Sequence, residues 1–245
     1  ASAAAGHWRA RLSGLRAVTP LPFDRPPARA HRTRADTVVD VRLTAAASAE
    51  LYDFARRHRV TVNAVVQGMW AVLLWQYGGV ADVCFGATVS GRTPDVPGVE
   101  AMIGMFVNTV PVRVRTDPEA ELAPWLAELH AERIADRRHD HVALTSLPRP
   151  GGRPGGAALF DSIVVFENYP VDTAAFAALG ADLAGLDAVE VTNYPLNVVV
   201  SAAEELALRL VYDPALFDAD TCRAVAGHLV ALLTAAPGAA RRPLS

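Results

Sequence analysis

Lysine is absent from this sequence of 245 residues, and all 23 of its basic residues are arginine. The chain therefore has neither the lysine of a phosphate-binding P-loop nor an amine for Schiff-base chemistry. Exclusive use of arginine, with abundant alanine and valine, is typical of a high-GC bacterial genome, and we expect an actinobacterial source. The composition excludes two kinds of chemistry and indicates a host rather than an activity.

Cysteine is nearly absent as well. Cys84 and Cys222 are far apart and lie in apolar segments, so we interpret them as core thiols rather than a disulfide or metal ligands. His139 and His141 flank Asp140 in an H-x-H pattern, but no second cluster of ligands accompanies them. The sequence therefore predicts no metal site.

A strong excess of charge and a long hydrophobic run are also missing. The formal net charge is −3, with 51% apolar and 20% charged residues, as in an ordinary soluble globular protein. The longest apolar run, 62–75, is too short to cross a bilayer, and the N-terminus lacks a secretory pattern. We therefore expect no nucleic-acid partner, no membrane and a cytoplasmic location. Because the chain begins with Ala1 rather than Met, we also expect a piece of a longer polypeptide.

Helical and strand patterns alternate along most of the chain. Thr61 is a good N-cap for an apolar, buried helix that Gly78 and Gly79 end, and Pro118 suits the first turn of another helix. The patterns predict an α/β fold with helices packed on a mixed sheet of five or six strands. Helices are expected at 1–15, 45–58, 62–77, 118–138 and 219–234, and strands at 37–43, 82–90, 107–115, 161–167, 196–202 and 206–212.

Three stretches are expected to be irregular. Residues 19–37 are rich in Pro and Arg and indicate an extended, solvated linker. Residues 139–158 contain seven Gly and Pro residues, and 169–191 are mildly acidic. We divide the chain into a helix with linker at 1–36, one main domain at 37–235, and at 236–245 the start of a linker to a following domain.

Four stretches carry a family pattern. The first is VNAVVQGMWAVLL at 62–74. The second runs from YGG at 77–79 through DVCFGATVSGR at 82–92 and PGVE at 97–100 to MIGMFVNTVPVR at 102–113. The third is LFDSIVVFENYP at 159–170, and the fourth joins YPL at 194–196 to YD at 212–213 and Phe217. In this order and spacing they resemble the late motifs of condensation domains from modular nonribosomal peptide synthetases.

The resemblance implies two chloramphenicol-acetyltransferase-like lobes in a V, with the active site in the tunnel between them. This chain would be the C-terminal lobe, beginning where Trp8-Arg9-x-x-Leu12 resembles the stretch that follows the first lobe. The family's catalytic H-H-x-x-x-D-G motif belongs to that first lobe, and no His-His pair occurs here. We therefore expect no catalytic residue in this chain and no activity from it alone.

The resemblance also implies a reaction and its partners. Such domains form an amide between a donor acyl or peptidyl thioester and an acceptor aminoacyl thioester, both held on carrier proteins. The expected partners are the N-terminal lobe of the same domain, the upstream and downstream peptidyl carrier proteins and the adjacent adenylation domain. No cofactor is expected on this chain, because phosphopantetheine belongs to the carrier proteins.

Ten residues are candidates for the site. Ser90 ends a strand and Gly91 permits a sharp turn, so Ser90-Gly91-Arg92 either lines the tunnel floor or is a loop that Arg92 anchors to a carboxylate. Asn108 either fixes the adjacent loop or faces the substrate, because a buried amide needs a partner. The substrate-tunnel set is Ser90, Gly91, Arg92, Gly104 and Asn108; the latch and inter-lobe set is Glu167, Asn168, Tyr169, Asn193 and Tyr194.

Two other interpretations remain open. The chain is alternatively a non-catalytic module that docks carrier proteins or an adenylation domain. It is also compatible with the C-terminal lobe of an epimerisation or cyclisation domain, which shares the fold and differs in the first-lobe motif.

Overall fold

A single mixed sheet organises the protein. The structure, a computed structural model, describes residues 2–28, 31–92, 98–99, 102–104, 106–148, 158–167 and 192–244. Within them six strands pair in the order β1-β6-β5-β4-β2-β3. The pairs β2–β4 and β4–β5 are parallel and the others antiparallel, which confirms the predicted mixed sheet. The strands are β1 (Thr37–Arg42), β2 (Asp82–Val89), β3 (Asn108–Arg115), β4 (Ser162–Glu167), β5 (Leu196–Ala202) and β6 (Leu206–Tyr212).

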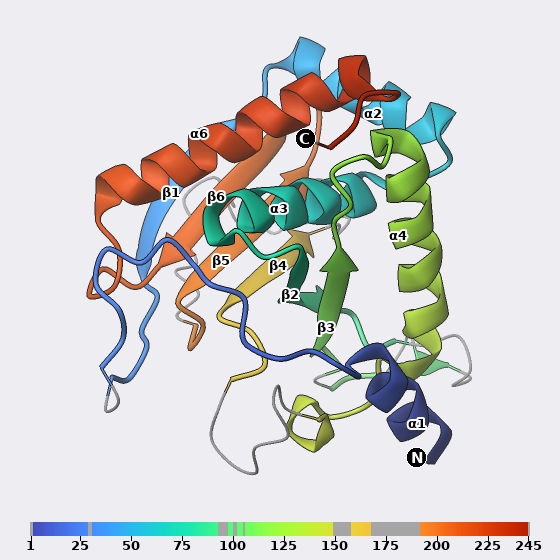
Figure 1. Cartoon of the computed structure of the whole chain (residues 1–245), viewed down its shortest axis with the longest axis vertical. Coiled ribbons are helices and arrows are strands. Elements are labelled where there is room, and N and C mark those ends of the chain that lie inside the picture. Colours follow the sequence, from blue (N-terminus) through green and yellow to red (C-terminus); the bar gives the residue numbers. More distant parts are fainter. Residues whose placement is uncertain are drawn as a thin grey trace, which may run out of the picture.

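The long helices cover one face of this sheet. In Figure 1 the helices α3, α4 and α6 lie in front of the strands, and α3 crosses the middle. Buried side chains of four helices and all the central strands form one main core, so the chain does not divide into two domains near residue 150. The helices are α1 (Ser2–Arg11), α2 (Ala45–Arg57), α3 (Val62–Gly78), α4 (Leu122–Asp136) and α6 (Ala219–Ala235).

The central helix α3 forms as its sequence predicts. The Thr61 side chain accepts a hydrogen bond from the Ala64 N–H at 3.2 Å, which satisfies one of the free donors of the first turn. Gly79 ends the helix in the left-handed conformation, with φ of 63°. Every residue from Ala64 to Leu74 is buried, because the sheet, α4 and α6 surround this helix.

The fourth helix begins four residues later than the sequence predicts. Pro118 lies in a turn in which the Ala120 N–H donates to the Asp117 carbonyl at 3.0 Å, and α4 starts at Leu122. A different proline, Pro124, occupies the first helical turn, where its missing N–H leaves no intrahelical bond unmade.

The C-terminal segment caps α4. Glu121 makes no side-chain cap bond; instead the carbonyls of Ala240 and Arg242 accept from the N–H groups of Ala123 and Leu122 at 2.9 and 3.1 Å. Residues 236–244, expected to begin a linker, therefore pack on the domain and satisfy donors that the helix end would otherwise leave free.

A second, smaller core covers part of the other face of the sheet. Trp8, Leu12 and Leu15 lie on one side of the N-terminal segment, as predicted, and all three are buried there. The indole N–H of Trp8 donates to the His139 carbonyl at 3.0 Å. The remaining buried members are Cys84, Val110, Leu147, Leu159, Phe160 and Ile163.

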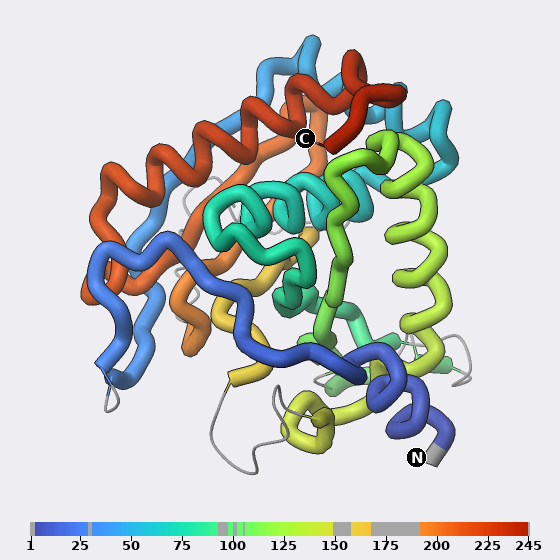
Figure 2. The backbone as a smooth tube through the Cα atoms, in the orientation of Figure 1, coloured from blue at the N-terminus to red at the C-terminus, as the bar shows by residue number. Residues whose placement is uncertain are grey.

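The Pro- and Arg-rich segment between α1 and β1 is extended but not free. Figure 2 shows it running across the domain towards the start of α6. Phe23 stacks on Phe217 with 5.0 Å between ring centroids, and the Arg25 guanidinium pairs with Asp218 at 2.8 Å. The predicted solvated linker is thus held along the domain by one buried aromatic contact and by an exposed ion pair.

Both thiols are buried in the cores, as predicted. Burial raises the pKa of Cys84 and of Cys222 to about 12. Because the thiolate is the nucleophile, we expect neither cysteine to react with iodoacetamide at pH 8 in the folded chain. Both should react once the chain is unfolded in urea, and mass spectrometry measures the two states. Rapid labelling of Cys84 in the folded protein would contradict this packing.

One helical stretch, Ala219–Ala239, has the length and hydropathy of a membrane span. Cys222, Val225, Leu229 and Leu233 on α6 are buried in the main core. A core helix passes the same test of length and composition, so this stretch alone does not indicate a membrane span.

Candidate functional site

A wide depression contains most of the residues that the sequence predicted for the tunnel wall, and we take it as the candidate site. Its volume is about 1310 Å³. The end of β2 and the strands β4 and β5 line it, together with the first turns of α3 and the second half of α4. Ser90, Gly91 and Arg92 of the predicted tunnel set lie in this wall, whereas Gly104 and Asn108 are outside it.

The end of β2 and the start of β3 bring the predicted site residues together. Val89 is paired directly with Asn108 in the antiparallel register, so Ser90 and Asn108 lie at the same rim of the sheet. Ser90 is exposed at this rim. We predicted this proximity from one strand end and one strand start, and the register of the hairpin produces it.

Arg92 organises the loop that follows. Its Nη1 donates to the carbonyls of Val99 and Met102, the latter at 3.1 Å, and its guanidinium lies over the Phe106 ring at 4.5 Å. The anchoring partners are therefore backbone carbonyls and an aromatic face, not the carboxylate of the alternative interpretation. A guanidinium has five donors and a planar face, so it serves both contacts at once.

Gly91 is required at its position for two reasons. Its φ is +65°, and a Cβ built there would approach the Phe106 carbonyl oxygen to 1.7 Å. We expect Gly91→Ala to displace the 91–106 loop and to lower the unfolding free energy by about 1–3 kcal/mol, since both backbone strain and overlap must be relieved. Urea unfolding measures the loss.

Gly79→Ala is a suitable control for that variant. Gly79 has a similar φ of +63°, but no atom lies within 4 Å of a Cβ added there. Gly79→Ala should therefore lower the free energy of unfolding only by the cost of holding an alanine at a positive φ. Equal losses for the two variants would mean that the close approach to Phe106 contributes nothing.

Asn108 fixes a neighbouring loop. Its Nδ2 donates to the carbonyls of Asp140 and Val142 at 2.6 and 2.9 Å, and its Oδ1 accepts from the Thr109 N–H at 2.9 Å. The amide is engaged with the protein at both ends, so the geometry favours the first of its two predicted roles. Gly104 is exposed, and a Cβ there would meet the Phe106 ring at 3.3 Å.

The latch candidates divide between described and undescribed residues. Asn168 and Tyr169 lie outside the described residues. Glu167 ends β4, lines the depression and accepts a hydrogen bond from the Ser201 hydroxyl at 2.7 Å. Asn193 is exposed, and the half-buried Tyr194 stacks on Phe160 with 5.5 Å between centroids. The structure therefore brings Glu167 to the wall and places Tyr194 against the second core.

Two wall residues were missed by sequence reasoning. Gln67 and Asp140 are buried and line the depression, and each has a side-chain oxygen without a hydrogen-bond partner. The signals were a glutamine inside an otherwise apolar helix and an acid within an H-x-H pattern, which we weighed only as a possible metal site. Arginines also outnumber acids in this wall: Arg56, Arg92, Arg133, Arg137 and Arg138 face Asp140 and Glu167.

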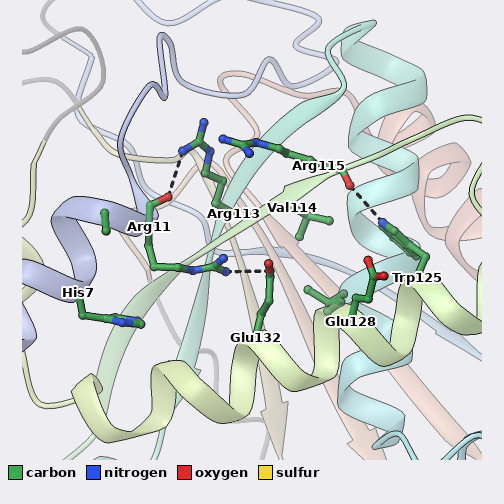
Figure 3. Close-up of a pocket in the computed structure, with 10 residues that line it drawn as sticks. His7, Arg11, Arg113, Val114, Arg115, Trp125, Glu128 and Glu132 are labelled. Atoms are coloured by element: carbon green, nitrogen blue, oxygen red, sulfur yellow. Dashed lines mark hydrogen bonds and ion pairs between the residues drawn. The ribbon is translucent and has the colours of Figure 1, made fainter.

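A smaller pocket of about 390 Å³ lies between α1, β3 and α4. Figure 3 shows Arg11 bridging its walls: its carbonyl accepts from Arg113 at 3.0 Å, and its guanidinium pairs with Glu132 at 3.1 Å. Arg113 also forms a bidentate pair with Asp82 at 2.8 and 2.6 Å. These contacts tie α1 to the domain, so we assign the pocket to structure rather than to chemistry.

The described residues of the depression wall contain no nucleophile hydrogen-bonded to a histidine. The side-chain partners of the hydrogen-bonded histidines are Asp136, Asp213 and Tyr77. His130 is an imidazole of the depression wall, and it lies on α4 without a described nucleophile beside it. The wall offers hydrogen-bonding groups and charge but no set of residues that is sufficient for catalysis.

Comparison with known families agrees with this geometry. The family model described as Condensation domain matches residues 2–245. The chain belongs to the condensation-domain family. Chondramide synthase cmdD from Chondromyces crocatus is 39% identical over 236 residues, which cover 96% of this chain and 6% of that protein. Bacitracin synthase 3 from Bacillus licheniformis is 30% identical over 230 residues, which cover 93% of this chain and 4% of that protein. These relatives give no support to the actinobacterial source expected from composition.

Solved structures show how much of the fold this condensation-domain chain spans. The first condensation domain of the calcium-dependent antibiotic synthetase, in complex with a substrate analogue, superposes with a TM-score of 0.78 at 18% identity and establishes likeness of fold. The X-domain from teicoplanin biosynthesis, solved with OxyB, gives 0.76 at 25% identity. Both superpositions include 99% of this chain, but only 52% and 54% of those chains. The chain therefore spans about half the length of these solved relatives.

Proposed function

We propose that this chain is the C-terminal lobe of a condensation domain in a nonribosomal peptide synthetase, and that its depression is one wall of the reaction tunnel. The observation that carries the proposal is the rim at which Ser90 and Asn108 meet, because it opens onto a depression of about 1310 Å³. Coverage of only half of the solved relatives supports the idea that a second lobe faces this wall.

Exposed apolar side chains near the rim support a facing lobe. Ile103 is fully exposed at 104%, and Met102, in the same loop, is 43% exposed. Val107 and Ile134 line the depression and are 51% and 52% exposed. A soluble surface rarely gathers such residues unless a partner covers them. The partner that we propose is the N-terminal lobe of the same domain.

The proposed reaction is attack of an acceptor amine on a donor thioester carbonyl, which forms an amide. It requires that two long arms be brought together, that a proton be moved and that polar groups stabilise the tetrahedral intermediate. This lobe would supply the wall, the 90–106 floor loop and the latch that begins at Glu167. The proton-moving histidine would come from the facing lobe.

The partners follow from the reaction. Upstream and downstream peptidyl carrier proteins would bring both thioesters on phosphopantetheine arms, and an adenylation domain would be adjacent. The positive wall suits arms that carry a phosphate, because the lining arginines outnumber the acids. No bound cofactor is proposed for this chain, and we propose a cytoplasmic location.

A docking module is the second candidate. The likeness to an X-domain solved in complex with OxyB favours it, since that domain binds another protein. The test is dipeptide formation from loaded carrier proteins by this chain combined with the half encoded before it. Amide product supports condensation, a change in substrate stereochemistry supports epimerisation, and binding without product supports docking.

A further inference from the structure

Two buried oxygens in the depression wall lack hydrogen-bond donors. Among the described residues, Gln67 Oε1 and Asp140 Oδ1 are the buried side-chain atoms without a partner. Gln67 is 4% exposed and Asp140 is 6% exposed, and both residues line the same depression. A buried acceptor without a donor destabilises the protein unless something supplies the donor. This wall is therefore built to receive groups that carry N–H or O–H donors.

Asp140 lies next to the rim of the proposed site. Its backbone carbonyl accepts from Asn108 Nδ2 at 2.6 Å, and Asn108 is paired with Val89, which precedes Ser90. A turn also holds Asp140, because its N–H donates to the Arg137 carbonyl at 3.4 Å. The Asp140 backbone is thus fixed at the Asn108 rim, and Asp140 and Ser90 line the same depression.

The protein's own cations leave this carboxylate without a direct partner. Arg133 is the nearest buried cation in the sequence, but its guanidinium is bound to Asp136 at 3.1 Å. Burial raises the pKa of Asp140 to about 6, an effect that Asp136 reinforces and that Arg133 and Arg137 oppose. At pH 7 the group is mainly ionised, so a donor that also carries positive charge suits it better than a neutral one.

We propose that the Asp140 carboxylate binds the primary amine of the acceptor aminoacyl thioester and orients it at the Ser90 rim. The inference rests on the proposed function, because it assigns the nucleophilic amine of that reaction to a place in the wall. Among the groups that every aminoacyl phosphopantetheine arm of a primary amino acid shares, the amine alone combines several N–H donors with a positive charge. The role is substrate binding, with no covalent step at Asp140: the bound ammonium must first lose a proton to the histidine proposed for the facing lobe, and only the resulting neutral amine attacks the thioester carbonyl.

The first test compares two probes on the complete domain, made of this chain and the half encoded before it. One probe is an aminoacyl pantetheine with an amide in place of the thioester, and the other is its N-acetyl derivative. With aspartate carboxyl carbons labelled with ¹³C, NMR follows the titration of Asp140, which Asp140→Asn assigns. The free-amine probe should lower the titration midpoint, since a nearby cation favours the ionised carboxylate. No shift, or an equal shift with the acetylated probe, overturns the inference.

The second test is kinetic. Asp140→Asn should raise KM for the acceptor probe about tenfold or more, because a hydrogen bond to a charged group typically contributes that much, and should leave the donor KM unchanged. Asp161→Asn is the matched control: burial also raises the pKa of Asp161, but that residue does not line the depression. The substitution at 140 removes a buried charge, so the variant should fold.

The two proposals fail in different ways. Amide formation by the wild-type domain with an unchanged acceptor KM for Asp140→Asn overturns the role of Asp140 and leaves the proposed function intact. Absence of amide product from the wild-type domain overturns the proposed function, and the titration then decides the role of Asp140 by itself.

Discussion

Incubated alone with loaded donor and acceptor carrier proteins, the chain is expected to form no dipeptide above the uncatalysed background. No His-His pair occurs in its 245 residues, and the described wall has no nucleophile activated by histidine. A positioned acid or base typically contributes about 10² to 10⁴ in rate. Alignment of two reactants contributes effective concentrations of about 10⁵ to 10⁸ M, and a single open wall does not enforce that alignment.

Addition of the separately expressed N-terminal lobe, which we propose as the partner, should restore product, provided that the two lobes associate. Mass spectrometry of the acceptor carrier protein measures the product, and size-exclusion chromatography measures the association. Ile103→Asp should weaken this association, because it places a charge on a fully exposed apolar side chain of the proposed floor loop. Turnover by the lone chain at the rate of the mixture would mean that the chemistry resides in residues described here.

Asp136→Ala is expected to lower the free energy of unfolding by about 3–5 kcal/mol, because it leaves three largely buried basic side chains without the buried carboxylate that they share. The Asp136 side chain is 1% exposed and receives three groups. His7 Nε2 lies at 2.6 Å, Arg11 Nε at 3.3 Å and Arg133 Nη1 at 3.1 Å from its oxygens. The cluster joins α1 to the end of α4, so its loss should also release the N-terminal helix.

Asp53→Ala provides the control for that measurement. Asp53 pairs with Arg56 on the same helix at 2.8 Å, and its side chain is 51% exposed. An exposed pair of this kind contributes about 0–1 kcal/mol. Urea unfolding of both variants gives the difference, and limited proteolysis near Arg11 reports on the release of α1. Similar losses for both variants would contradict the central role of the buried carboxylate.

Local chemistry in the sequence determined most of the elements. Thr61 and Gly79 mark the ends of α3 because capping depends on the residues themselves, and the apolar character of 64–74 already required burial on all sides. The family pattern was likewise readable, because its motifs are local and ordered. The start of α4 was not, since Ala240 and Arg242 supply its cap from the other end of the chain.

Only the tertiary structure decided what the predicted site residues contact. Asn108 was left between two roles, and the loop at 140–142 resolves them because it brings two carbonyls to the amide. For Arg92, a carboxylate anchor was one of two alternatives, and the fold instead places carbonyls and a phenyl ring within its reach. Asp140 became a candidate because its Oδ1 atom is buried without a hydrogen-bond donor. Such properties depend on which residues, distant in the sequence, lie next to one another in the fold. The type and spacing of side chains along the chain do not specify these neighbours.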